Sequence, residues 1–250
     1  MSCVILKFGG AAMASIDQFA KLAKLIEKRL NKFSAVVVVV SAMGSTTDEL
    51  MELAGKVHRN PPKREQDMLV SVGERVSMAL LAMALDARGI DAISFTGSQS
   101  GIITSDEHSD ARILEVRPER VRSALGRGKV VIVAGFQGVS LEKEITTLGR
   151  GGSDTSAVAL AVALKADKVE FYKDVPGIGK VNPKVDPDTE IFSELSFDQT
   201  LEIVGEGAEV LHHRCLEMAK EHGMKLEIRP YYDPDWLGTE ICPLKSMQKI

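Results

Sequence analysis

Short apolar runs without polar alternation recur along this chain, and they limit the possible fold more than any other feature. Ala35–Val40 and Val130–Ala134 are the clearest of these runs. A strand that is apolar on both faces suits a parallel sheet that is covered on both sides. The sequence therefore predicts an α/β fold with a mainly parallel central sheet. The other expected strands are Cys3–Phe8, Ala92–Phe95, 169–172 and 226–228.

Segments with helical periodicity fill the gaps between these runs. Ser15 and Gln18 form a capping-box pattern, and apolar residues then recur on one face as far as Leu30. Further helices are expected at 48–57, at 64–88 with Gly89 as the stop, at 154–164, and at 208–222 with Gly223 as the stop. The alternation predicts a three-layer α/β/α sandwich, with 1–250 forming a single domain.

Composition and charge exclude several classes of protein. A chain of 250 residues that is 44% hydrophobic can bury a sizeable core, and its net charge of -4 offers no basic surface for nucleic acid. The longest apolar runs are too short to span a bilayer, so no membrane partner is expected. Three widely spaced cysteines fit a reducing compartment, and no leader is expected before Lys7. These observations predict a cytoplasmic protein.

A glycine-rich turn at 146–154 precedes the apolar helix expected from 154 onward. It places Arg150 at the mouth of that helix, where unpaired backbone N–H groups and the helix dipole favour an anion. At the end of the first strand, Lys7 is followed by Gly9 and Gly10, which let the backbone approach a charged ligand closely. Taken alone, that second pattern is more often an ordinary tight turn. Neither the Walker loop nor the Gly-x-Gly-x-x-Gly fingerprint is present.

The order of these motifs, together with the segment from Ser41 to Leu50, resembles the catalytic domain of aspartate kinases in the amino acid kinase family. The resemblance covers about the whole chain. It implies the amino acid kinase fold, ATP and Mg²⁺ as cofactors, aspartate as the phosphoryl acceptor, a homodimer, and a place in lysine biosynthesis. It also implies an amino-acid-binding lobe at about 1–145 and a nucleotide-binding lobe at about 146–250. Family members usually continue into ACT regulatory domains, and we expect none here.

The same resemblance assigns the residues of an amino acid pocket. Glu74 would receive the α-ammonium group of the substrate, and Arg150 would hold its α-carboxylate through two hydrogen bonds. Other interpretations are open for part of this set: Glu74 as a solvated helix charge, Thr46 or Thr47 as a helix cap, and Ser153 or Asp154 as the cap of the next helix. The remaining pocket residues implied are Ser41, Thr47, Phe136 and Ser153.

The implied chemistry needs charge neutralisation more than proton transfer. A side-chain carboxylate is already ionised at neutral pH, so no general base is required. Lys7, the amides of Gly9 and Gly10, and Mg²⁺ bound largely through phosphate oxygens would stabilise the transferring group. Asp154 would orient Lys7 or a metal-bound water. The implied nucleotide-binding residues are Lys173, Asp174, Gly179, Lys180, Lys184 and Glu209.

Several positions depart from the family pattern. Ala11 and Ala12 replace a threonine and a serine, Gly179 stands in place of a tyrosine, and Glu209 in place of a lysine. Two alternatives therefore stay open: a kinase for another amino acid or acid, and a catalytically poor homologue that serves as a binding or regulatory protein. The adjacent residues His212 and His213 are interpreted as packing or surface residues, because neighbours on a helix cannot share one metal ion.

Overall fold

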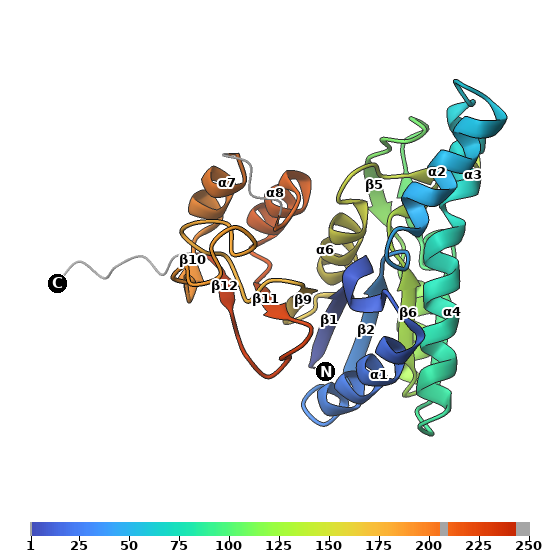
Figure 1. Cartoon of the computed structure of the whole chain (residues 1–250). Helices are drawn as coiled ribbons and strands as arrows, with labels where there is room; N and C mark the ends of the chain where they lie inside the picture. The colour runs from blue at the N-terminus through green and yellow to red at the C-terminus, as the bar shows by residue number, and fades with distance from the viewer. Residues whose placement is uncertain (1, 206–209, 244–250) are drawn as a thin grey trace.

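The architecture is a central sheet of eight strands with helices on both faces (Figure 1). The structure is a computed structural model that describes residues 2–205 and 210–243. The strand order is β10-β12-β11-β9-β1-β2-β6-β3, and every neighbouring pair is parallel except β11 with β12. The mainly parallel sheet predicted from the sequence is thus confirmed. The strands are β1 Cys3–Phe8, β2 Ala35–Val40, β3 Ala92–Phe95, β6 Val130–Ala134, β9 Lys168–Lys173, β10 Glu194–Leu195, β11 Leu226–Pro230 and β12 Thr239–Ile241.

The apolar runs are unbroken because each strand is buried on both faces. Val37 and Val39 of β2 enter a core with α5, α6 and α8, whereas Val36 and Val38 enter a second core with α1 and α4. Successive side chains of a strand point to opposite faces, so both alternating sets must be apolar. The helices that cover the two faces are α1 Ile16–Leu30 and α4 Val72–Asp86 on one side, and α5 Glu119–Gly126, α6 Gly152–Leu164, α7 Phe197–Gly205 and α8 His213–His222 on the other.

A second, four-stranded sheet was not expected from the sequence. Its strands are short and partly polar, so they lack the apolar runs that identify the central sheet. Its last strand leads directly into the glycine-rich turn before α6, and the sheet therefore supports that turn. The order is β5-β4-β7-β8, with β4 Ile102–Thr104, β5 Ile113–Val116, β7 Gln137–Ser140 and β8 Ile145–Thr147.

Four of the expected helices differ from those observed; one of them, α6, was expected to begin at 154 and begins at Gly152. The helix predicted at 64–88 is two helices, α3 Lys63–Val70 and α4, because the Ser71 carbonyl accepts a hydrogen bond of 2.8 Å from the Gln137 amide. Within the predicted segment 208–222, α8 begins at His213, and 208–209 lie outside the described residues. The helix predicted at 48–57 is α2 Thr46–Val57. Ser15 is the N-cap residue of α1, but its side chain makes no capping hydrogen bond.

The continuous segment Lys63–Asp86, which joins α3 and α4, is long and apolar enough to cross a membrane by length and composition alone. The mean hydropathy of its most apolar 18-residue stretch is 1.6, and 39% of that stretch is buried. A helix in the core of a soluble protein can have the same properties, and α4 packs against α1, β3 and β6. The absence of a membrane partner stays a prediction.

The parallel strands end in register at one edge of the sheet. Phe8 at the end of β1 pairs with Val40 of β2 and with Tyr172 of β9. The residues around these three strand ends therefore meet at one edge, which is where α/β proteins of this kind bind ligands. Lys7, Ser41 and Lys173 all lie there.

A buried ion pair joins α1 to the sheet, away from this edge. Arg29 donates a hydrogen bond of 2.7 Å to Glu170, and the side chains are 4% and 1% exposed. Glu170 also accepts a hydrogen bond of 2.5 Å from the Tyr172 hydroxyl and pairs with Lys168 at 2.9 Å. Burial alone would raise the pKa of Glu170, but Arg29 and Lys168 outweigh it and hold this pKa below its usual value. The network needs all its members, since a lone buried charge is costly.

Arg29→Met is expected to lower the free energy of unfolding by about 3–5 kcal/mol, because it leaves Glu170 buried without its principal partner. Lys28→Met is the matched control: Lys28 pairs with Asp235 at 2.8 Å on the surface, and removing an exposed pair costs below about 1 kcal/mol. Urea unfolding of both variants measures the difference. Equal losses would contradict the structural role assigned to Arg29.

Candidate active site

A cavity of about 290 Å³ lies at the sheet edge where β1 and β2 end. Side chains from distant parts of the sequence meet in it, because the strand ends, the start of α4 and the turn before α6 all converge there. Of the residues singled out from the sequence, it brings together Lys7, Gly10, Ser41, Thr47, Glu74, Phe136, Arg150, Ser153 and Asp154. Gly9 lies next to them in the chain, and a Cβ there would stand 3.7 Å from Lys7 Nζ.

Two lysines share the carboxylate of Asp154. Lys7 Nζ lies 2.6 Å from Asp154 Oδ1, and Lys173 Nζ lies 2.9 Å from Oδ2. Burial alone would raise the pKa of Asp154, but the two ammonium groups overcome this effect and hold it at about 2. Burial lowers the pKa of Lys7, although Asp154 opposes the shift. Asp154 therefore stays ionised at neutral pH, so it holds the lysines in place and is a poor proton acceptor.

Glu74 is a buried carboxylate with one unsatisfied oxygen. It is 2% exposed, its Oε1 accepts a hydrogen bond of 3.1 Å from the Ala42 N–H, and its Oε2 has no hydrogen-bond partner among the described residues. Burial raises the pKa of Glu74 to about 7. The interpretation of Glu74 as a solvated helix charge is wrong. An unpartnered acceptor that lines a cavity suits a cationic ligand.

The close approach that places Glu74 depends on Gly73. A Cβ at this position would lie 2.7 Å from the Cβ of Ala42, which is closer than Cβ atoms approach other atoms in real structures. Only glycine lets the start of α4 come so near to the segment after β2. A glycine in the middle of an exposed helix is costly, and this close contact explains its presence here.

The turn between β8 and α6 has two glycines in the left-handed region, Gly149 at φ 72° and Gly151 at φ 69°. Arg150 between them is exposed, and its side chain has no ion-pair or hydrogen-bond partner among the residues described. Phe136 packs over this turn, since a Cβ on Gly152 would lie 3.0 Å from its ring. Arg150 is thus a cation on a tightly packed turn, with its charge available to a ligand.

The capping alternatives do not fit the observed helix ends. Ser45 is the N-cap residue of α2, so Thr46 and Thr47 lie inside the helix. Gly151 is the N-cap residue of α6, so Ser153 and Asp154 lie in its first turn. There the backbone N–H groups and the dipole of α6 are directed toward the cavity that these residues line.

A second cavity of about 300 Å³ adjoins the first at the carboxyl end of β9. Lys173 lines it and pairs with Asp154, which lines the first cavity, so this ion pair lies between the two. Lys184 pairs with Asp174 at 2.7 Å, and Lys180 pairs with Glu190 at 2.6 Å. Apolar side chains complete the walls, and the lining includes Lys173, Asp174, Gly179, Lys180, Lys184, Ile178, Val181, Ile203 and Val210.

Gly179 is required by local packing. A Cβ there would lie 2.4 Å from the Thr189 side chain and 2.6 Å from the Val181 carbonyl oxygen. A tyrosine at this position would need a different arrangement of the loop, which explains how the chain accommodates this departure. Glu209 lies outside the described residues.

Two further residues near the turn were not assigned a site role from the sequence. His212 caps α8 by accepting a hydrogen bond from the Arg214 N–H, and its side chain packs on Gly151, where a Cβ would come within 2.2 Å of the His212 Cβ and 2.5 Å of its ring. Asp67 of α3 binds the end of β8. His213, the neighbour of His212, is exposed and lies 3.2 Å from Glu217. Within 2–205 and 210–243, no group of three or more potential metal ligands occurs.

Comparison with known proteins points to one family. The model of the amino acid kinase family matches residues 2–230. An aspartokinase of Geobacillus stearothermophilus is 49% identical over 249 residues, which cover 100% of this chain and 61% of the relative. Curated aspartokinases of Bacillus, Geobacillus and Corynebacterium are longer than this chain, which spans 56 to 61% of their length.

Solved structures of aspartate kinases have the same fold. An aspartate kinase from Synechocystis superposes with a TM-score of 0.85 at 46% identity, over 96% of this chain and 40% of the other. E. coli aspartokinase III in complex with aspartate and ADP gives a TM-score of 0.89 at 26% identity, over 98% of this chain and 66% of the other.

The raised pKa of Glu74 makes stability depend on pH. A carboxyl whose pKa is 4.5 when unfolded and about 7 when folded binds its proton more strongly in the folded state, so stability falls as pH rises through that window. Glu74→Gln is expected to be more stable than the parent at pH 8 and about as stable at pH 5. Urea unfolding at both pH values, with Glu52→Gln on the surface of α2 as control, measures this. A difference independent of pH would contradict it.

Proposed function

The chain belongs to the amino acid kinase family, and we propose that it transfers the γ-phosphoryl group of ATP to the side-chain carboxylate of L-aspartate, giving 4-phospho-L-aspartate. The observation that carries the proposal is the Lys7–Asp154–Lys173 cluster between two cavities. One cavity has an acidic and a basic side chain that can bind an amino acid, and the other has lysines and apolar walls that can bind a nucleotide. A phosphoryl group passing between them meets both lysines.

The acceptor is held at both ends of its amino acid group. The unsatisfied Oε2 of Glu74 receives the α-ammonium group, and the guanidinium of Arg150 receives the α-carboxylate. Hydroxyl groups on the same walls add polar contacts, and the remaining side-chain carboxylate is then directed toward Lys7. The hydroxyl residues are Ser41, Thr47 and Ser153.

The nucleotide occupies the second cavity. Its base packs on the apolar wall, and its phosphates lie toward Lys173, with Lys180 and Lys184 exchanging their present carboxylate partners for phosphate oxygens. Mg²⁺ commonly binds through one or two carboxylates together with substrate phosphates, and Asp154 and Asp174 are the nearest carboxylates. When bound, it neutralises phosphate charge.

No proton needs to move in the reaction. The acceptor carboxylate is ionised, one of its oxygens forms a bond to the γ-phosphorus, and the bond to the bridging oxygen breaks to release ADP. Lys7 and Lys173 neutralise charge on the transferring group, while Asp154 keeps them at the junction of the cavities. The amides of Gly9 and Gly10 and the start of α6 contribute further donors.

Several finer features belong to the same proposal. Residues 1–145 supply most of the amino acid site and 146–250 most of the nucleotide site, with the turn around Arg150 serving the acceptor. Cytoplasmic localisation and a role in lysine biosynthesis agree with this activity. Ala11 and Ala12 leave the first turn without hydroxyl donors, which favours backbone amides as the phosphate contacts there and keeps a binding homologue as the second candidate.

An assay of ADP release, with hydroxylamine trapping of the acyl phosphate, tests this function. Aspartate should be a good acceptor, whereas succinate and β-alanine should be poor because each lacks one of the two groups held by Glu74 and Arg150. Lys7→Ala should lose ~10²–10³ in turnover, since a donor to the developing charge is removed. Lys24→Ala, an exposed lysine of α1, is the control.

The possible outcomes separate the candidates. Efficient use of succinate would rule out recognition of the acceptor by both Glu74 and Arg150. Unchanged turnover in folded Lys7→Ala would rule out the role of Lys7. ATP binding in calorimetry without turnover of any acceptor would favour the binding homologue.

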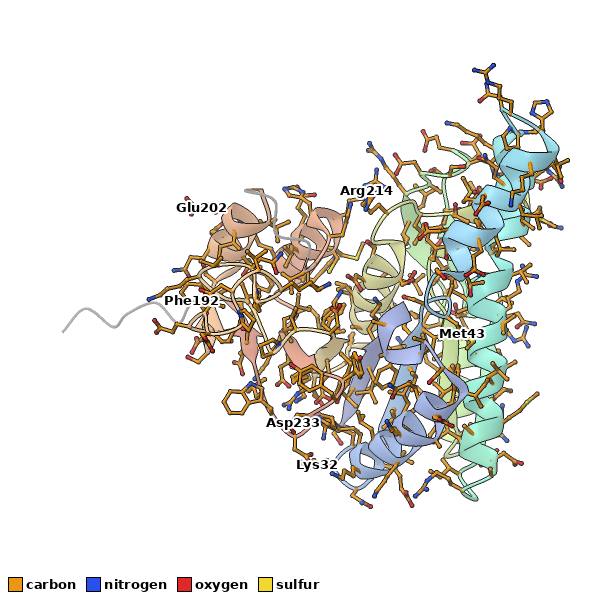
Figure 2. All side chains as sticks on the ribbon, viewed as in Figure 1. Lys32, Met43, Phe192, Glu202, Arg214 and Asp233 are labelled. Atoms are coloured by element: carbon orange, nitrogen blue, oxygen red, sulfur yellow. The ribbon has the colours of Figure 1, made fainter. Side chains whose placement is uncertain are left out.

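We propose in addition that two copies of the chain associate through the outer face of α3 and α4. Figure 2 shows side chains projecting from this face, away from the rest of the molecule. Four large apolar side chains on it are 40 to 65% exposed, and no charged residue occurs between Arg75 and Asp86. An exposed face of this kind suits a protein interface. The four residues are Met68, Val72, Val76 and Met83.

A second copy is the occupant that the charges favour. Arg75 lies near the start of α4 and Asp86 at its end, both at the border of the apolar face. A two-fold axis that sets the two α4 helices antiparallel brings Arg75 near the partner's Asp86 twice. The same face thus complements itself in charge.

Val76→Asp should convert a dimer into a monomer in analytical ultracentrifugation, because the new carboxylate would be buried against a second copy. Leu114→Asp is the control, since Leu114 is an equally apolar residue on β5, 59% exposed and remote from α4. A parent protein that is monomeric throughout, or a Val76→Asp variant that remains dimeric, would contradict this interface.

A further inference from the structure

Asp67 is a buried carboxylate that lies outside both cavities. It is 0% exposed on α3, and every partner that it has comes from two other segments. Thr147 of β8 donates to it through its hydroxyl at 2.6 Å and through its N–H at 3.1 Å. Ser109 donates through its N–H at 3.1 Å, and His108 Nδ1 lies at 2.8 Å. Asp67 thus joins α3, β8 and the loop between β4 and β5.

Both of these segments adjoin the turn that carries Arg150. Thr147 is the last residue of β8, three positions before Arg150. The loop lies against the turn itself, since a Cβ on Gly149 would be 2.9 Å from Asp110 Oδ1 and 3.1 Å from the Ser109 carbonyl oxygen. The contacts of Asp67 therefore fix one side of the turn and the loop that packs on it.

The same loop is held from its other end by α8. Arg214, labelled in Figure 2, pairs with Asp110 at 2.8 Å. Ser109 has a left-handed backbone conformation, at φ 71°, which is costly for a residue other than glycine. Two hydrogen bonds from its backbone and hydroxyl to Asp67 offset this cost. The loop between β4 and β5 is thus held in place both by α8 and by Asp67.

Arg150 depends on this support because no described residue holds its side chain directly. It has no hydrogen-bond or ion-pair partner in the described part of the chain, and it lies between two glycines with positive φ. Its position is set by the backbone before and after it. After Arg150 in the chain, α6 begins at Gly152 and holds the backbone. Before Arg150, the backbone is held by the hydrogen bond from Thr147 to Asp67.

We propose that Asp67 is a positioning residue that sets Arg150 for the α-carboxylate of the acceptor. The proposal rests on the proposed function. Asp67 lines neither cavity, so it acts through the turn and lowers the cost of ordering Arg150 when the substrate binds. Its effect falls on acceptor affinity and leaves the phosphoryl transfer step and the nucleotide site unchanged.

The test compares two neighbouring threonines of β8. Thr147→Val removes the 2.6 Å hydrogen bond to Asp67 and keeps the shape of the residue and its N–H. Thr146→Val is the matched control, because Thr146 is equally buried on the same strand but its hydroxyl bonds to Thr104 at 2.5 Å. A hydrogen bond to a charged group is worth about tenfold or more in an equilibrium.

Thr147→Val should raise the KM and Kd for aspartate about tenfold, with kcat and the KM for ATP within about twofold of the parent. The inhibition constant of β-alanine, which lacks the α-carboxylate, should not change. Thr146→Val should change none of these values. Asp67→Asn, which presents an NH₂ group to the donors, should show the same pattern with a larger rise in the aspartate KM.

Thermal unfolding of all variants separates folding from positioning. A Thr147→Val variant that loses stability like Thr146→Val while binding aspartate normally would overturn the proposal, as would equal losses for aspartate and β-alanine. A parent protein that binds no aspartate in calorimetry would instead refute the proposed function. In that case, amide hydrogen exchange at 148–152 still tests the positioning role of Asp67. The exchange should be faster than in the parent for Thr147→Val and unchanged for Thr146→Val.

Discussion

The shared carboxylate of Asp154 is the interaction on which the site depends. Lys7 and Lys173 come from neighbouring parallel strands, and like charges so close together would repel without an acid between them. Asp154 enters from the first turn of α6 and neutralises one of the two charges. The cluster keeps a net positive charge in a nearly dry place, at the junction of two cavities, where the proposed phosphoryl transfer needs it.

The buried acids Glu170, Asp67 and Glu74 differ in how fully their oxygens are satisfied, and this difference supports the ligand-binding role proposed for Glu74. Glu170 and Asp67 have partners for both oxygens, and each joins elements of the fold. Glu74 has one oxygen without a hydrogen bond among the described residues, and burial raises its pKa to about 7. A buried carboxylate that lines a cavity and has an oxygen without a hydrogen-bond partner suits a cationic ligand.

The departures from the family pattern are local, and the structure accounts for one of them. Gly179 avoids contacts of 2.4 Å and 2.6 Å that any side chain would make with the loop around it. Lys173 lines the same cavity as Gly179 and pairs with Asp154. These two positions shape the same cavity by packing and by charge, and neither disturbs the strands that end beside it.

The sequence by itself determined six of the eight strands of the central sheet, because strands buried on both faces have to be apolar throughout; β1, β2, β3 and β6 lie at the predicted residues, whereas the short strands β10 and β12 were not predicted. It also indicated the glycines and charges that gather at the sheet edge. Only the tertiary structure decided the second sheet, the break at Ser71 and the roles of Asp67 and His212. These depend on contacts between residues far apart in the chain, such as Gln137 with Ser71 and Thr147 with Asp67, and no local pattern encodes such pairings.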